Sequence, residues 1–150
     1  MSVLVNNQAT FKISFYFREI KNKENETIGI GFPRVEYRDD DFNITDFEVH
    51  EGEDKEDYKN FTGIFIPGNF EQMSLIREEA SVINHINEKS VLLLRIFCPK
   101  IIHHLCKEWN LVNDNGEPLR IHEECAKQMH EHFLSRIIEE WRTRVGDGDY

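Results

Sequence analysis

Apolar and polar residues alternate through most of the first half of the chain, with the period of two that half-buried strands have. From residue 10 to residue 20, Phe11, Ile13, Phe15 and Phe17 alternate with lysine, serine, tyrosine and arginine. Further strand-like stretches cover residues 27–37, 41–50 and 61–68, and the polar residues 22–26 form a turn. The step between apolar positions 44 and 47 predicts a bulge or break. These patterns predict a small antiparallel sheet.

The spacing of apolar residues changes to three and four after Asn69. Asn69 precedes Gln72 by three residues, which is the spacing of a capping box at the start of a helix. The apolar residues that follow on one helical face are Met73, Ile76, Ala80 and Ile83. We therefore predict a first amphipathic helix, which residues 85–90 interrupt.

Helical spacing resumes at Ser90 and continues across a proline. The residues at this spacing are Val91, Leu94, Cys98, Ile101, Leu105 and Trp109. A proline removes a helical hydrogen bond and disfavours helix in the residue before it, so we expect two short helices or one kinked helix, meeting near Pro99. A last helix is predicted from about residue 122 to residue 144, with apolar residues at every fourth position: Met129, Phe133, Ile137 and Trp141.

The whole pattern is typical of an α+β fold, with an N-terminal small antiparallel sheet followed by three or four helices. We expect a single domain over residues 1–150, with a strand-rich half of about residues 1–68 and a helical half of about residues 69–145. A chain of this size buries roughly two thirds of the surface that its unfolded form exposes. The eleven phenylalanines are enough to fill one core.

Composition argues against two classes of partner. The net charge of −10 is unsuited to nucleic acid, because phosphate binding needs a basic surface. The longest apolar run is far shorter than the ~20 residues of a membrane span, and the first residues do not resemble a signal peptide. The three cysteines lack the spacing of a disulfide scaffold. We therefore predict a cytoplasmic protein that binds neither nucleic acid nor membrane.

Most of the net negative charge is concentrated between residues 39 and 57. The ten acidic residues there, against Lys55 alone, are Asp39, Asp40, Asp41, Asp46, Glu48, Glu51, Glu53, Asp54, Glu56 and Asp57. A solvated loop is the simpler interpretation. As a functional surface, with Asp54, Glu56 and Asp57 among the contacts, the segment would attract a basic protein by electrostatic steering.

Cysteine and histidine are frequent in the second half, at Cys98, His103, His104, Cys106, His122, Cys125, His130 and His132. Two Cys–His pairs have a spacing of three residues, 103 with 106 and 122 with 125, so each would project from one helical face. Two such faces would together form a tetrahedral zinc site. The competing interpretation is packed cysteines and solvated histidines, because the spacing is unlike a zinc knuckle. We predict no metal and no other cofactor, and zinc stays open as an alternative.

Catalytic interpretations of the cysteines are weak. Cys106 or Cys125 beside a histidine would need an electropositive environment to act as a nucleophile. Glu123, Glu124 and Glu131 surround Cys125 in the sequence and are expected to raise its pKa instead. The sequence therefore predicts a protein that is not an enzyme.

The stretch WNLVNDNGEPL, residues 109–119, resembles a signature of the tail assembly chaperones of long-tailed phages. The matching residues are Trp109, Asn110, Leu111, Asp114, Gly116, Pro118 and Leu119. In that family a helix ends in Trp-Asn-Leu, crosses an acidic turn and leads into a final helix. The resemblance covers mainly residues 90–145 and does not extend to the strand-rich residues 10–66.

This resemblance, together with turn chemistry, predicts the local structure. Trp109 and Leu111 would fill a gap between helices, while Gly116 supplies the positive φ of the turn. Pro118 and Leu119 would bring the chain back against Trp109. The last helix is expected to lack an evident N-cap, because the family's proline and Ser or Thr cap are replaced by Arg120, Ile121 and His122.

The function that the resemblance implies is not catalytic. Such proteins bind the long helical tape measure protein, keep it soluble and help tail-tube subunits polymerise around it. The implied mechanism is burial of apolar helical side chains in a groove, with candidate contacts Phe133, Leu134, Ile137, Ile138 and Trp141. An internal core role is the competing interpretation of that stripe. The alternative function is an acidic immunity or anti-defence protein that binds and blocks a basic toxin or nuclease.

Overall fold

The computed structural model describes residues 4–6, 8–84, 89–92 and 94–146. The first half holds β1 (Phe11–Lys21), β2 (Thr27–Gly31), β3 (Val35–Arg38), β4 (Ile44–Glu48), the 3-10 helix η1 (Lys55–Asp57) and β5 (Lys59–Phe65). The second half holds α1 (Phe70–Glu79), β6 (Ser81–Asn84), β7 (Lys89–Leu92), α2 (Leu94–Leu105), β8 (Cys106–Trp109), α3 (Glu123–Lys127) and α4 (Glu131–Val145). The predicted α+β fold, with strands followed by helices, is confirmed.

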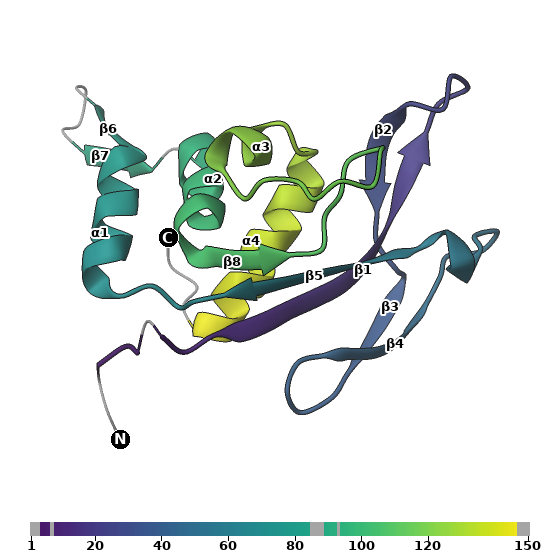
Figure 1. Cartoon of the computed structure of the whole chain (residues 1–150), viewed down its shortest axis with the longest axis horizontal. Helices are drawn as coiled ribbons and strands as arrows, with labels where there is room; N and C mark the ends of the chain where they lie inside the picture. Colours follow the sequence, from purple (N-terminus) through teal and green to yellow (C-terminus); the bar gives the residue numbers. More distant parts are fainter. Residues whose placement is uncertain (1–3, 7, 85–88, 93, 147–150) are drawn as a thin grey trace.

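The main sheet is antiparallel and has the strand order β2-β1-β5-β8. The long strand β1 pairs with β5 through residues 11–17 and with β2 through residues 18–21. The helices gather at one end of the β1–β5 pair, and β2 and the β3–β4 hairpin lie at the other end (Figure 1). The helices at that end therefore cover the apolar face of β1 and β5.

The β3–β4 hairpin forms a separate sheet and contains the predicted bulge. Tyr37 pairs with Asp46 whereas Arg38 pairs with Ile44, so β4 has one extra residue, Thr45. Two ion pairs tie this hairpin to α4: the Arg38 guanidinium lies 2.6 Å from the Glu140 carboxylate, and Arg136 lies 2.7 Å from Glu36. The acidic segment 39–57 is consequently more than a loop, because it includes β4 and η1.

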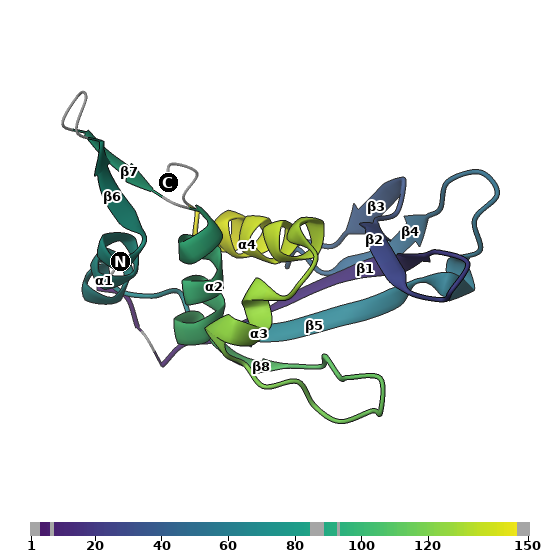
Figure 2. The same cartoon turned by 90° about the horizontal axis from the view of Figure 1, so that it is seen from above.

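The capping box at the start of α1 is confirmed. The Asn69 side chain accepts a hydrogen bond from the Gln72 amide at 2.9 Å, and the Gln72 side chain accepts one from the Asn69 amide at 3.1 Å. The predicted extent of this helix is wrong, because α1 ends at Glu79 and Ile83 lies in β6. Ser81–Asn84 pairs instead with Lys89–Leu92, and the β6–β7 hairpin projects beyond α1 (Figure 2).

The helix predicted from Ser90 begins four residues later, at Leu94, and Val91 lies in β7. α2 continues as one helix across Pro99, so the alternative of two short helices is wrong. Pro99 is fully buried, and core packing offsets the hydrogen bond that proline removes. The helix ends at Leu105 and the chain continues directly as β8, an edge strand.

The last predicted helix is two helices, α3 and α4, with Met129 in the break between them. Each begins at a histidine whose imidazole acts as the N-cap. His122 Nδ1 accepts a hydrogen bond from the Glu124 amide at 3.1 Å, and His130 Nδ1 accepts one from the His132 amide at 3.2 Å. The expectation that the last helix lacks a cap was wrong, because an unprotonated imidazole nitrogen satisfies the free amide as a Ser or Asp oxygen would.

Aromatic rings form the centre of the core. The ring centroid of Phe133 on α4 lies 5.6 Å from that of Phe15 on β1 and 5.6 Å from that of Phe61 on β5. Trp141, also on α4, is fully buried and donates its indole N–H to the Ile66 carbonyl at 3.3 Å. α4 is therefore packed onto the β1–β5 face along its length, as the spacing of its apolar residues predicts.

Candidate functional site

The stretch that resembles the phage family forms a closed loop after β8. The Trp109 indole N–H donates a hydrogen bond to the Leu119 carbonyl at 2.8 Å, and the Leu119 amide donates one to the Leu111 carbonyl at 2.9 Å. Gly116 has φ 79°, and Pro118 forms a bridge with the opposite side of the loop. The predicted positive φ and the return of the chain to Trp109 are confirmed.

The predicted setting of that loop is wrong, because Trp109 lies on a strand and not between helices. β8 pairs with β5, and Trp109 is the register partner of Gly63. Asn110 prolongs the pairing with its side chain, which accepts a hydrogen bond from the Thr62 amide at 3.0 Å and donates one to the Asn60 carbonyl at 2.8 Å. Trp109 and Leu111 are half-buried and pack against the edge of the core.

The sequence interpretation missed Asn113, which organises the turn of the loop. Its side-chain oxygen accepts hydrogen bonds from the Asn115 amide at 2.9 Å and from the Glu117 amide at 3.0 Å. An Asn two residues before a turn position is a known signal for such side-chain–backbone bonds. The signal is present in the sequence, where Asn113 stands two residues before Asn115 and Gly116 follows.

Four of the five candidate contacts on the last helix lie in the core. Phe133, Ile137, Ile138 and Trp141 are exposed by 6% or less, whereas Leu134 is half-buried. The four buried side chains hold α4 against the sheet, which is the competing interpretation of the stripe. Leu134 is therefore the one member that a partner reaches without opening the core.

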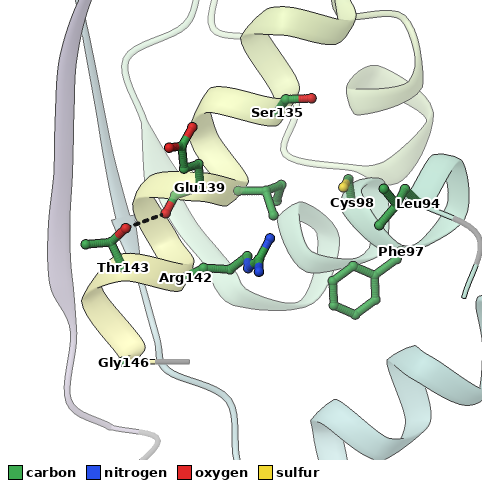
Figure 3. A pocket seen from close by; sticks show the side chains of 9 residues that line it. Leu94, Phe97, Cys98, Ser135, Glu139, Arg142, Thr143 and Gly146 are labelled. Atoms are coloured by element: carbon green, nitrogen blue, oxygen red, sulfur yellow. Dashed lines mark hydrogen bonds between the residues drawn. The ribbon is translucent and has the colours of Figure 1, made fainter. Parts of the chain in front are cut away.

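A groove separates α4 from α2 on the side away from the sheet. It consists of two adjoining cavities of about 630 and 730 Å³, and Figure 3 shows one of them. Both cavities are lined by Leu94 and Cys98 of α2 and by Ser135 of α4. Leu94 is 62% exposed at the mouth of the groove. Two of the five predicted contacts line this groove, Ile138 in one cavity and Leu134 in the other, whereas Phe133, Ile137 and Trp141 face the sheet.

Charged side chains flank the groove on both sides. Glu131 and Glu139 are exposed on α4, and Arg95 is exposed on α2. Glu139 and Arg95 form no ion pair with a described residue, and Glu131 lies 3.5 Å from the His132 imidazole. At the inner end, burial raises the pKa of the Cys98 thiol, and the positive charge of Arg142 opposes part of that rise.

The acidic segment is attached to the sheet through Glu53. The Tyr58 hydroxyl donates to the Glu53 carboxylate at 2.6 Å, and the Arg18 guanidinium lies 3.0 Å from it. The hydrogen bond from Tyr58 is the main reason that the pKa of Glu53 is lowered. Burial, reinforced by Glu53, raises the pKa of Tyr58 to about 12. This inward attachment leaves the residues of η1 on the outside of the segment.

The three predicted acidic contacts lie at η1. The Asp54 carboxylate caps this short helix by accepting a hydrogen bond from the Glu56 amide at 2.9 Å. Asp54, Glu56 and Asp57 are all exposed. Asp54 therefore has a structural role, while the other two carboxylates are presented to solvent.

The cysteines and histidines do not assemble as the zinc alternative requires. Cys106 begins β8, so it does not share a helical face with His103. The His103 ring lies 4.6 Å from the His122 ring, whose Nδ1 caps α3. In the part of the chain that the structure describes, no group of three or more His, Cys, Asp or Glu is placed to hold a metal ion.

The thiols are poorly suited to nucleophilic chemistry. Burial raises the pKa of Cys106 to about 12 and also raises that of Cys125. The predicted rise at Cys125 is thus present, but its cause is burial and not the neighbouring glutamates. At neutral pH a thiol with a raised pKa stays protonated and is a weak nucleophile.

No protein-family model, curated protein or solved structure matches the chain. Among the described residues, no helix combines the length and the apolar character needed to cross a membrane.

Proposed function

We propose that the chain is a non-catalytic, tail assembly chaperone-like protein. It would bind the tape measure or tail-tube protein of a long-tailed phage during assembly of the virion tail, in the host cytoplasm. The closed loop of residues 109–119 carries this proposal. Several residues that match the family pattern take part in closing the loop: the Trp109 indole donates to the Leu119 carbonyl, the Leu119 amide donates to the Leu111 carbonyl, and Gly116 has the positive φ of the turn.

The groove between α2 and α4 adds support, because it offers a helical partner an apolar surface. Helix-in-groove recognition needs a hydrophobic channel next to exposed apolar side chains, and Leu94 and Leu134 have these positions. The tape measure protein is long and helical in the family. A helix of such a partner has the shape that fits this channel.

A tagged pull-down from cells that express the native neighbours of the protein tests the proposal. Mass spectrometry of the retained proteins should identify a very long helical protein or a tail-tube subunit. The Glu56→Gln, Asp57→Asn double variant is the control. It should retain the same proteins, because these two carboxylates lie in η1, just before β5, and do not line the groove. Recovery of a compact basic toxin or nuclease in place of tail proteins would refute the proposal.

The alternative of an acidic inhibitor rests on a different surface. Within the acidic segment, the exposed carboxylates that form neither a hydrogen bond nor an ion pair with a described residue are those of Asp40, Asp41, Glu51, Glu56 and Asp57, since Asp39 and Asp54 accept backbone hydrogen bonds. Under this alternative the association rate with the basic partner falls steeply as salt is raised. If the Glu56→Gln, Asp57→Asn variant loses the basic partner, the inhibitor function is favoured. If its association rate equals that of the wild type, the inhibitor function is rejected.

A further inference from the structure

The short helix α3 begins at a histidine that lies against two histidines of α2. The centroid of the His122 ring is 4.6 Å from that of His103, and the His103 centroid is 4.8 Å from that of His104. His122 is also the N-cap of α3, because its Nδ1 accepts a hydrogen bond from the Glu124 amide at 3.1 Å. Three imidazoles therefore meet where α3 packs against the end of α2.

The central ring of this cluster is in surroundings that favour a neutral imidazole. The Nδ1 atom of His103 is shielded from solvent and forms no hydrogen bond with a described residue. Burial and, to a smaller extent, the rings of His104 and His122 lower the pKa of His103. A proton added to any one of these rings therefore places a positive charge next to two further imidazoles.

The charged side chains around the cluster do not reverse that preference. Lys100 of α2 forms ion pairs with Glu123 of α3 at 2.8 Å and with Glu79 of α1 at 2.9 Å. The Glu123 carboxylate raises the pKa of His103, whereas the Lys100 ammonium lowers it. Because burial and the other imidazoles act in the same direction as Lys100, the pKa of His103 stays lowered.

Protonation of His122 removes the cap of α3. An imidazolium carries hydrogen on both ring nitrogens and has no acceptor left, so its Nδ1–H would point at the Glu124 amide N–H. The new positive charge would also lie at the positive end of the helix dipole. The Glu124 carboxylate is 3.2 Å from the Lys127 ammonium, which already balances its charge. The capped start of α3 therefore requires a neutral His122.

We propose that His122 and His103 form a pH-dependent switch that holds α3 on α2 at neutral pH and releases it in acid. Imidazoles gain their proton between about pH 8 and pH 5. Protonation then removes the cap, and like charges on neighbouring rings repel each other. Release of α3 frees Ala126, which is fully buried, and Met129, which borders the α2–α4 groove. The cap and the ring contacts carry this inference, and it does not rest on the proposed function.

Amide hydrogen exchange of the full-length protein at about pH 7.5 and 5.5 tests the switch, with each rate corrected for the intrinsic rate at that pH. The Ala126 amide donates to the His122 carbonyl at 3.1 Å. In the wild type its protection should fall about tenfold at the lower pH, the combined effect of a lost cap and a charge at the helix start. The Gln72 amide of α1 is the internal reference, because the Asn69 side chain that caps it does not titrate. Its protection should stay the same.

The His122→Asn variant isolates the titrating cap. Asparagine is a preferred N-cap, and its side-chain oxygen accepts the Glu124 amide at either pH. Protection of the Ala126 amide should therefore be equal at the two pH values. His50→Gln is the matched control, because His50 is exposed and lies before η1, outside the cluster. It should lose Ala126 protection as the wild type does. Circular dichroism at each pH shows that the variants are folded.

Three results would overturn the switch. The first is a wild-type Ala126 amide that keeps its protection at the lower pH. The second is a fall of equal size in the wild type and in His122→Asn, which would assign the change to groups other than this cap. The third is an equal loss at the Gln72 amide, which would mean that the whole domain is destabilised and that α3 is not released by itself.

A fall at Ala126 in the wild type and in His50→Gln, without one in His122→Asn, supports the switch.

Discussion

Removal of the Trp109 side chain should open the loop that carries the family resemblance. A tryptophan in a full core costs about 3–5 kcal/mol when it is replaced by alanine. Trp109 is half-buried on an edge strand, so about half of that, ~2 kcal/mol, is expected from packing. The lost hydrogen bond to the Leu119 carbonyl adds about 1 kcal/mol. Trp109→Ala should therefore lower the free energy of unfolding by about 3 kcal/mol.

A denaturant titration measures this change, and Trp109→Phe separates its two parts. Phenylalanine keeps most of the packing and removes the N–H donor, so its cost should be about 1 kcal/mol. The chain has two tryptophans. The fully buried Trp141 therefore reports unfolding by fluorescence in both variants.

The size of the effect decides between three arrangements. A loss below about 1 kcal/mol in Trp109→Ala would mean that the indole does not close the loop. A loss of about 5 kcal/mol or more would mean that the indole is packed as in a full core, contrary to its half-buried position on β8. Hydrogen exchange gives a local check, because the Leu119 amide, bonded to the Leu111 carbonyl, should exchange faster in the alanine variant. Unchanged exchange there would refute the loop assignment even if the stability falls.

Four further substitutions test other parts of the fold. Gly68→Ala should destabilise by about 2–3 kcal/mol, because φ is +77° and the new Cβ would lie 3.0 Å from Met73 Sδ. Gly52→Ala, with φ +84° and no atom within 4 Å, should cost only the backbone strain of about 1 kcal/mol in the same titration. Asn69→Ala should cost about 1 kcal/mol through the lost cap, and an unchanged urea midpoint would contradict the capping box. Burial and, to a smaller extent, the neighbouring imidazoles lower the pKa of His103 below 6.5. As the pH drops, the unfolded chain therefore binds this proton before the folded chain does. Through this histidine, stability is highest above pH 6.5 and falls as the pH drops through it. His103→Gln should flatten that dependence in urea titrations at about pH 7.5 and 5.5.

The strands β1 and β5 were predictable because one face of each is buried and the other is not. In β1, Ile13, Phe15 and Phe17 are buried while the residues between them are exposed or half-buried. The pattern also placed the bulge, since Thr45 interrupts the alternation in β4. What the pattern did not contain is which strands pair. The separation of β3–β4 from the main sheet depends on long-range packing.

The second half was harder to predict, because apolar residues at helical spacing belong to strands as well as to helices. Val91, Leu94 and Trp109 fit one helical series, yet they lie in β7, at the start of α2 and at the end of β8. Each of these strands is four residues long, and a strand of that length is set by its neighbour more than by its own sequence. β8 forms because β5 has an open edge for it to pair with. The local pattern of apolar residues does not indicate that edge.

The last helix shows why a stripe alone does not define a contact surface. Every fourth residue from Phe133 to Trp141 is apolar, and periodicity identifies that face without indicating whether core or partner covers it. β1 and β5 cover it here, since the Phe133 ring lies against Phe15 and Phe61. A surface for a partner must then come from the adjacent side of α4, which is the side that borders α2. One helix thus stabilises the domain with its buried face and, under our proposal, binds the partner beside Leu134, so the two roles can be tested by different substitutions.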